Sequence, residues 1–481
     1  MITFALSIAL LVGGYFLYSK HLEKIMDIDP NRPTPAVKMS DGIDYVPMSW
    51  WRVLLIQFLN IAGLGPIFGA IAGAMWGPVA FLWITLGTIF GGAVHDYFSG
   101  MLSVKHDGKS ITEIIGIYMG KFSKQIMRIF TIVLLILVGV VFISGPAGLL
   151  AGMTPSTLDF NFWVWVIFIY YILATLMPID KIIGKIYPLF GFSLLFMAIS
   201  LIIALIVKGY HLPELTLGNF KNFHHESSSF PIFPMMFITI ACGAISGFHA
   251  TQSPLMARCL KNEKEGRKVF YGAMVIEAIV ALVWAAISMS FFGGLRELNE
   301  VMVAQNGNAA WVVNEVSISL LGKFGALLAI LGVVAAPITS GDTAFRSARL
   351  TVADLLKTSQ KPIKNRMIIT IPLFAIGFIL TRINFDIIWR YFAWANQTLA
   401  TVVLWTITIF LWQKKKNKSY LITLLPAIFM TSVVTTYIAL APEGFTLAKS
   451  ISYPIGIFFS LLTLSLFIYY TRKHSSRRIS D

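Results

Sequence analysis

The chain has 481 residues, of which 57% are hydrophobic and 13% are charged, and its formal net charge is +15. Soluble domains carry about 25% charged residues, so this composition excludes a globular protein that faces water on every side. The interval 53–94 contains no Asp, Glu, Lys, Arg or His. At about 20 residues per crossing, that interval alone is long enough to span a bilayer twice.

Apolar runs along the chain predict an all-α polytopic membrane protein with about 13 transmembrane helices. The runs cover residues 2–18, 50–75, 78–100, 122–150, 160–178, 187–208, 230–255, 268–293, 320–343, 366–382, 386–412, 419–440 and 451–471. The first run has no basic residue before it and no small-residue cleavage pattern after it, so we expect an uncleaved span rather than a signal peptide. Cys242 and Cys259 are too few for a disulfide framework.

The basic residues lie in short loops between the runs, which favours a role in membrane topology and argues against nucleic acid as a partner. Alternating loops hold 31 and 7 of the 38 Lys and Arg residues. Because cytoplasmic loops retain basic residues, this asymmetry predicts an N-terminus outside the cell and a cytoplasmic C-terminus. Residues 19–49 are then a cytoplasmic connection, residues 209–229 are external, and residues 298–319 lie along the outer interface.

Two runs, 50–75 and 230–255, contain glycines and a proline where a continuous lipid-embedded helix is expected. Paired interruptions of this kind indicate the substrate site of a transporter with inverted repeats. Five spans separate them, which predicts a five-plus-five inverted-repeat core with a broken first helix in each repeat, spans 2–6 and 7–11. The expected divisions are 1–49 (first span and loop), 50–208 (first repeat), 230–412 (second repeat) and 413–481 (two trailing spans and a basic tail). The alternative is that these glycines serve tight helix packing.

We expect the substrate to bind between the interruptions at Ala62–Pro66 and Ser246–Pro254, where half-helix N-termini carry partial positive charge. A neutral imidazole at His249 can donate to a carboxylate or carry a proton. The other reading of this histidine is a bond between helices. The candidate substrate-binding residues are Asn60, Ala62, Gly63, Gly65, Ser246, Gly247, His249, Thr251 and Gln252.

Three further ionisable residues within the runs are candidates for a gate or a proton relay: His95, Asp96 and Glu277. Ionisable groups in membrane helices are costly and mark functional sites by default. For Asp96 the structural alternative is a cap or a pair with a loop lysine such as Lys105. For Glu277 it is a protonated carboxyl or a pair with a histidine or a basic residue.

The run 320–343 carries the candidate ion-coupling residues Ala336, Thr339, Ser340 and Asp342. Hydroxyl oxygens are ligands for a hard cation such as Na⁺, and Pro337 frees backbone carbonyls one turn earlier. The alternative is that Asp342 pairs with Arg346, one turn further along the helix, while the hydroxyls bond their own backbone. Beyond this possible Na⁺, no metal and no cofactor is expected.

Four stretches resemble the signature of the carbon starvation protein A (CstA) family: Gly65–Pro78, His95–Met101, Gly247–Gln252 and Ala336–Asp342. The resemblance covers most of the chain. It implies a bacterial or archaeal membrane protein associated with starvation, and uptake of peptides or, in related members, pyruvate. It also implies the five-plus-five fold of the amino acid–polyamine–organocation superfamily. In sodium-coupled members of that fold an Ala-x-x-Thr-Ser run contributes to a cation site, a pattern that Ala336, Thr339 and Ser340 match.

These observations together predict a secondary active transporter in a prokaryotic cell membrane, which imports small carboxylate-bearing nutrients and uses a Na⁺ or H⁺ gradient. Its partners are a small-molecule substrate and the lipid bilayer, and its oligomeric state stays open. We do not expect an enzyme, because the runs contain neither a His-x-x-x-His pattern nor a Gly-x-Ser-x-Gly elbow. The alternative function is a membrane-embedded nutrient sensor or an uncoupled channel.

Overall fold

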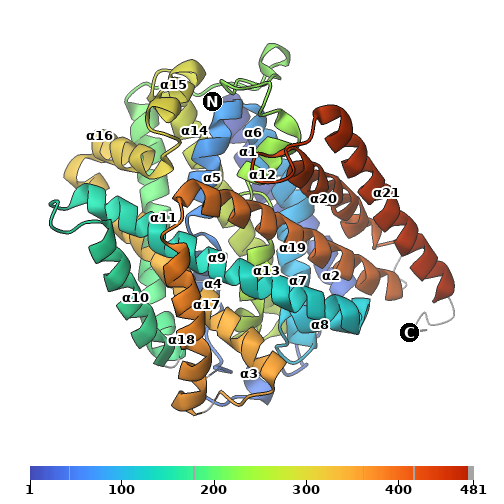
Figure 1. Cartoon of the computed structure of the whole chain (residues 1–481). Helices are drawn as coiled ribbons and strands as arrows, with labels where there is room; N and C mark the ends of the chain where they lie inside the picture. Colours follow the sequence, from blue (N-terminus) through green and yellow to red (C-terminus); the bar gives the residue numbers. More distant parts are fainter. Residues whose placement is uncertain (43, 177–178, 361, 415–417, 475–481) are drawn as a thin grey trace.

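The computed structural model describes residues 1–42, 44–176, 179–360, 362–414 and 418–474, and these fold into packed helices (Figure 1). An isolated parallel β-bridge joins Met48 and Leu260. The helices of the first half are α1 (Ile2–Gly13), η1 (Gly14–Tyr18), α2 (Ser19–Met26), α3 (Pro35–Lys38), α4 (Trp50–Ile61), α5 (Gly65–Gly73), η2 (Ala74–Trp76), α6 (Val79–Leu82), η3 (Trp83–Gly92), α7 (Ala93–Lys105), α8 (Ile111–Met119), α9 (Lys121–Met153), α10 (Phe160–Leu176), α11 (Ile179–Val207) and η4 (Leu217–Asn219).

The second half begins at the segment that precedes the second interrupted helix. Its helices are η5 (Ile232–Met236), α12 (Phe237–Thr239), α13 (Gly247–Ala257), η6 (Glu263–Glu265), η7 (Arg267–Tyr271), α14 (Gly272–Phe291), α15 (Leu295–Ala304), α16 (Ala309–Ala329), η8 (Ile330–Val334), α17 (Ala335–Leu356), α18 (Ile363–Leu380), α19 (Phe385–Gln413), α20 (Leu421–Leu440) and α21 (Lys449–Lys473). In Figure 1, α20 and α21 flank one side of the molecule, and α9 and α19 run obliquely across it.

The protein is an all-helical, multi-span membrane protein. Fewer of its described helices are long and apolar enough to cross a membrane than the 13 expected. Within the described residues, ten helices are long and apolar enough to cross a membrane, or eleven if the bent pair formed by α4 and α5–η2 is one span. The other two predicted runs fall short for different reasons. The apolar helix Phe160–Ala174 is short, and the segment 230–255 has an unwound stretch between two short helical pieces.

Several element boundaries differ from the sequence prediction, two of them at the starts and ends of spans that pack into the core. The first helix continues through α2 to Met26, because Leu22, Ile25 and Met26 form an apolar stripe that packs into the core. The region before residue 320 is helical as well: α16 begins at Ala309 and bends at Gly322, whose φ of +62° is left-handed. Glycine adopts that conformation without steric cost.

Loops that the charge pattern assigns to one side of the membrane contact one another. In the set predicted to be cytoplasmic, Arg32 pairs with Glu263 at 3.2 Å, and the Lys414 ammonium pairs with Asp27 at 2.8 Å. In the set predicted to be external, the amide of His225 donates to Asn299 at 3.0 Å. In Figure 1 the N-terminus and α15 lie at one end of the molecule and α3 lies at the other.

Candidate functional site

The two glycine- and proline-containing segments are both interrupted helices. The first is interrupted at residues 62–64, between α4 and α5, and its two halves meet at 47°. Pro66 fits there because it is the second residue of α5, where the missing N–H has no helical partner to lose.

The second interruption lies at residues 240–246, ahead of the range Ser246–Pro254 expected from the sequence. Gly247 to Ala257 are helical, with Pro254 inside α13. Pro254 is the eighth of the eleven residues of α13, and hydroxyl groups just before it bond backbone carbonyls. Ser253 Oγ donates to the carbonyl of His249 at 3.0 Å, and Thr251 Oγ1 donates to that of Phe248 at 2.6 Å. The carbonyl that loses its helical partner to Pro254 is that of Ala250, so neither of these two bonds replaces the missing one.

The unwound backbone before α13 is satisfied by side chains from η3. Thr88 Oγ1 donates to the carbonyl of Gly243 at 3.2 Å, and the Trp83 indole N–H donates to that of Ile240 at 3.0 Å. Unpaired polar backbone is unfavourable in hydrocarbon. These bonds therefore allow the segment before α13 to stay unwound inside the membrane.

Glycines of α5 pack directly against this second interruption. A Cβ on Gly65 would lie 2.3 Å from Cys242 Sγ, one on Gly69 would lie 2.8 Å from the Thr239 carbonyl, and one on Gly73 would lie 2.2 Å from Ile240 Cγ1. These residues form a Gly-xxx-Gly-xxx-Gly stripe of the kind that brings membrane helices together. Gly65 therefore faces protein, as the packing alternative predicts.

The start of α13 is held by Asn396 of α19, a residue that the sequence analysis did not select. Its Oδ1 accepts from Ser246 Oγ at 3.0 Å and from the backbone N–H of Phe248 at 2.6 Å. The side chain thus satisfies a first-turn N–H that the helix itself leaves open. Gly247 is necessary for this approach, because a Cβ there would lie 2.4 Å from the Asn396 carbonyl oxygen.

Four buried ionisable residues from three helices form a continuous chain beside this site. Within α7, Asp96 Oδ1 lies 2.8 Å from His95 Nδ1. Asp96 Oδ2 lies 2.8 Å from His249 Nδ1, and His249 Nε2 lies 3.4 Å from Glu277 Oε2 on α14. All four side chains are fully buried. Asp96 therefore contacts two histidines. Glu277 lies beside a histidine, and pairing with a histidine was one of the alternatives that the sequence left open for it.

The thiol of Cys242 lies close to the end of this chain. Its sulfur, an imidazole nitrogen of His249 and a carboxylate oxygen of Glu277 lie within 4.8 Å of one another. The thiol already has partners, since it lies 3.7 Å from Ser246 Oγ and accepts from Asn396 Nδ2 at 3.4 Å. We therefore assign no metal to this group.

The candidate ion-coupling residues lie on α17, where the hydroxyl groups bond carbonyls. Ser340 Oγ donates to the carbonyl of Leu59 at 2.7 Å, across to the last turn of α4. Thr339 Oγ1 donates to the carbonyl of Ala336 at 2.7 Å. Asp342 is buried on the same helix. The segment thus contacts the backbone that precedes the first interruption.

Two amide side chains of α4 are buried close to that interruption without hydrogen-bond partners in the described part of the chain. Both polar atoms of Gln57 and of Asn60 are unpaired, and both residues are fully buried. Their spacing of three residues places them on one helical face. Asn60 was expected from the sequence. Gln57 was missed, although this spacing could have identified it.

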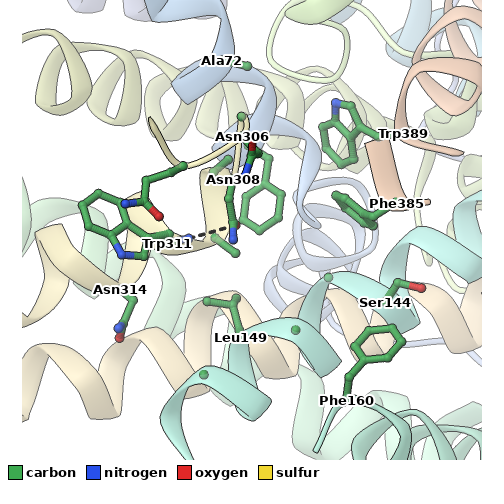
Figure 2. A pocket seen from close by; sticks show the side chains of 18 residues that line it. Ala72, Ser144, Leu149, Phe160, Asn306, Asn308, Trp311, Asn314, Phe385 and Trp389 are labelled. Atoms are coloured by element: carbon green, nitrogen blue, oxygen red, sulfur yellow. Dashed lines mark hydrogen bonds between the residues drawn. The ribbon is translucent and has the colours of Figure 1, made fainter. Parts of the chain in front are cut away.

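A cavity of about 630 Å³ lies between α5, α9, α16 and α19. Figure 2 shows Phe385 and Trp389 on one side and Asn308, Trp311 and Asn314 on the other. Among the described residues that line it, none is ionisable and none belongs to the predicted substrate-binding set. By the charge pattern it lies in the external half. On the other side Thr251 and Pro254 line a cavity of about 30 Å³.

Aromatic rings separate the large cavity from the interruptions. The rings of Phe68, Trp389, Phe392, Phe142 and Phe248, here called the aromatic layer, follow one another with centroid distances of 5.8, 5.6, 6.3 and 6.0 Å. Phe68 and Trp389 line the cavity, whereas Phe142 covers Gly63, where a Cβ would lie 2.6 Å from its ring. The predicted substrate position is therefore closed off from the cavity in this conformation.

Comparison with known protein families and structures agrees with this architecture. The family profile described as "Carbon starvation protein CstA" matches residues 1–158, 151–322 and 308–439. In solved structures, the fold is similar to the Eremococcus coleocola manganese transporter bound to an aromatic bis-isothiourea compound, with a TM-score of 0.52, 14% identity and coverage of 91% of this chain and 99% of that one. At this identity the similarity concerns the fold alone.

Curated relatives include a membrane protein of uncharacterised function from Haemophilus influenzae, 43% identical over 63% of this chain and 95% of that protein. The peptide transporter CstA of Helicobacter pylori is 25% identical over 87% of this chain and 79% of that protein. The pyruvate/proton symporter BtsT of Escherichia coli is 27% identical over 58% of this chain, and the match spans about half (48%) of that protein. With the profile match extending over most of its length, the chain belongs to the carbon starvation protein CstA family.

Proposed function

We propose that this protein is a secondary active transporter, which imports small carboxylate-bearing nutrients, peptides or pyruvate, by alternating access. The observation that carries the proposal is a cavity on one side of two interrupted helices, with tight packing on the other side. The aromatic layer closes the binding position off from that cavity in this conformation, and opening of such a layer on one side while the other side stays packed is what alternating access requires. The peptide and pyruvate carriers among the relatives support the two substrate classes.

The substrate position in this proposal lies between the two interruptions. Helix α5 begins at Gly65 and α13 at Gly247, and the partial positive charge of these half-helix N-termini favours a carboxylate. The unpaired amides of Gln57 and Asn60 supply donors and acceptors for the rest of the solute. Thr251 and Gln252 lie one turn into α13, where Gln252 Nε2 donates to Thr251 Oγ1 at 2.9 Å and Gln252 Oε1 is unpaired within the described residues.

For the coupling ion we propose H⁺ ahead of Na⁺. Ser340 Oγ donates directly to the Leu59 carbonyl, so two oxygens that a Na⁺ would share are bonded to each other in this conformation. The relative named a pyruvate/proton symporter points the same way. Ala336, Thr339, Ser340 and Asp342 stay the candidates for a Na⁺ site if a sodium gradient proves to drive uptake.

The remaining parts of the proposal concern architecture and context. Thirteen crossings, a five-plus-five inverted repeat over residues 50–208 and 230–412, an external N-terminus and a cytoplasmic C-terminus form one consistent arrangement. The cell membrane of a prokaryote is the proposed location, and starvation the proposed condition of use, which is the role that the family's name describes.

Uptake by proteoliposomes tests the function. The purified full-length protein is reconstituted, and accumulation of labelled dialanine and labelled pyruvate is followed under an inward H⁺ gradient, an inward Na⁺ gradient or neither. We expect accumulation of one of the two solutes above its external concentration with the H⁺ gradient. Equal rates under all three conditions would contradict coupled transport and favour an uncoupled channel, and absence of flux would favour a sensor.

A further inference from the structure

We propose that the coupling proton is held between His249 and Glu277, with Asp96 and His95 as positioning residues for the His249 imidazole. This inference rests on the proposed H⁺-coupled uptake and names the place in the protein where the proton binds. It is carried by the buried chain of four ionisable side chains that joins α7, α13 and α14.

The first step in the argument is the orientation of the imidazole. Asp96 is hydrogen-bonded through one oxygen to His95 and through the other to His249 Nδ1, each at 2.8 Å. A carboxylate accepts, so His249 Nδ1 carries the hydrogen and Nε2 faces Glu277. Neither His249 Nε2 nor the two Glu277 oxygens has a hydrogen bond in the described part of the chain. In the row of four ionisable side chains, the end without hydrogen bonds is therefore the pair formed by His249 Nε2 and the Glu277 carboxylate.

The second step is the charge that surrounds the pair. Among the described residues, the titratable groups that face it are Asp96 of α7, which also contacts His95, and Cys242 of the unwound segment. Helix α5 has no titratable residue, the only one of α4 is Arg52 in its first turn, and α19 presents the neutral Asn396. The carboxylates of Asp96 and Glu277 give this group two negative charges when both are ionised. One proton bound between His249 Nε2 and Glu277 removes one of these charges.

The third step is burial. All four side chains are fully buried, and an uncompensated charge is strongly unfavourable in the protein interior. The closed conformation therefore holds the additional proton, on Glu277 or shared with His249 Nε2. Opening of the site to water solvates the carboxylate. The Glu277 O–H bond then breaks, the proton passes to a water molecule, and the electron pair stays on the carboxylate.

Coupling to the solute follows from where the two partners are attached. His249 lies in the first turn of α13, directly after the unwound segment 240–246, whereas Glu277 lies in the continuous helix α14. A change in the tilt of α13 that opens the substrate position therefore also separates His249 from Glu277. The proton and the solute are bound and released in the same movement.

The test separates exchange from accumulation in proteoliposomes. For one proton per solute, a gradient of one pH unit supports about tenfold accumulation. We expect Glu277→Gln to lower this to onefold, while exchange of labelled for unlabelled solute across the membrane continues, because exchange needs the solute site and not a net proton movement. Glu315→Gln, which removes a carboxylate of α16 outside this group, is the matched control and should keep the full accumulation.

Two further variants test the positioning roles. Asp96→Asn keeps the shape of the side chain but removes its charge, so we expect a shifted pH profile of accumulation with exchange retained. Glu277→Asp keeps a carboxylate and should restore part of the gradient-driven uptake. If Glu277→Gln does not elute as a folded protein in size-exclusion chromatography, Glu277→Asp replaces it as the test. Glu277→Asp should then show an altered pH profile of accumulation.

The outcomes distinguish the two proposals. Absence of H⁺-driven accumulation in the unmodified protein would overturn the proposed function. Full accumulation by Glu277→Gln would overturn the inference and leave the function intact. If a folded Glu277→Gln protein loses both exchange and accumulation, Glu277 has a structural role. This result would also overturn the inference. A stoichiometric metal found by elemental analysis, and lost in Glu277→Gln, would assign the group to a metal instead.

Discussion

At the scale of single residues, Gly63 shows how closely the first interruption is covered. A Cβ there would lie 2.6 Å from the Phe142 ring, and a contact under 3 Å forces the ring or the backbone to move. We expect Gly63→Ala to destabilise the protein by about 1–3 kcal/mol through overpacking, measured by thermal unfolding in detergent. Gly13→Ala is the control, because nothing lies within 4 Å of a Cβ at Gly13. An unchanged melting temperature for Gly63→Ala would show that the aromatic layer yields easily.

His224, in the loop between η4 and η5, gives a pH-dependent prediction outside the membrane spans. Burial, and secondarily the nearby His225, lowers the pKa of His224 from 6.5 to about 4. Its ring stacks on Phe230 at 4.8 Å, and its Nδ1 accepts from the Glu226 amide at 3.1 Å. Protonation of Nδ1 breaks that bond.

Between pH 6.5 and 4 the unfolded loop binds more protons than the folded one, so the stability of the loop falls as the pH falls through this window. Hydrogen exchange of residues 209–230 at several pH values measures the effect. His224→Phe keeps an aromatic ring in the stack and should remove the pH dependence. If the variant shows the same loss of protection in acid, another group is responsible.

At the scale of elements, the start of α13 depends on a side chain from α19. Asn396→Ala removes the acceptor of the Phe248 amide and the Ser246 hydroxyl, leaving buried donors unpaired at about 1–3 kcal/mol. We expect a lower melting temperature and slower exchange of solute in proteoliposomes. Thr398→Ala is the matched control on the same helix, since its hydroxyl bonds its own backbone at Trp394. Equal effects of the two variants would argue against the capping role.

The sequence identified the two interrupted helices because glycine and proline act locally. The exact position of the second interruption was less predictable. Pro254 marks a break by composition, yet α13 continues through it to Ala257. Asn396 was not predictable at all, because its role depends on the approach of α19 to α13 across about 150 residues of chain.

The ionisable residues of the site were predictable as single residues, but their contacts with one another were not. Asp96, His249 and Glu277 were selected one by one, because charges in apolar runs are conspicuous. Nothing in a single sequence indicated that they touch, since Asp96 and His249 are separated by 153 positions. The packing of α7 and α14 around α13 brings them together. Whether they carry out the proposed role is a question for the exchange experiment.

At the scale of the whole molecule, the loop contacts define two ends that can be tested for sidedness. Ser228 lies in an exposed loop of the predicted external set and Lys264 in one of the cytoplasmic set. In cells, Ser228→Cys should react with a membrane-impermeant maleimide, and Lys264→Cys should react after permeabilisation alone. The native Cys242 and Cys259 are buried and give a low background, which the unmodified protein controls. The opposite pattern of labelling would invert the proposed topology.

The glycine stripe of α5 has a mechanical consequence. Gly65, Gly69 and Gly73 bring α5 close against Cys242, the Thr239 carbonyl and Ile240 in the segment that leads into α13. The two interrupted helices are therefore fastened together over two turns, and neither can slide far along the other. We expect α5 and residues 239–242 to rotate as one rigid unit inside the frame formed by α9 and α17, so that the hinges lie at residues 62–64 and 243–246 and not along the stripe.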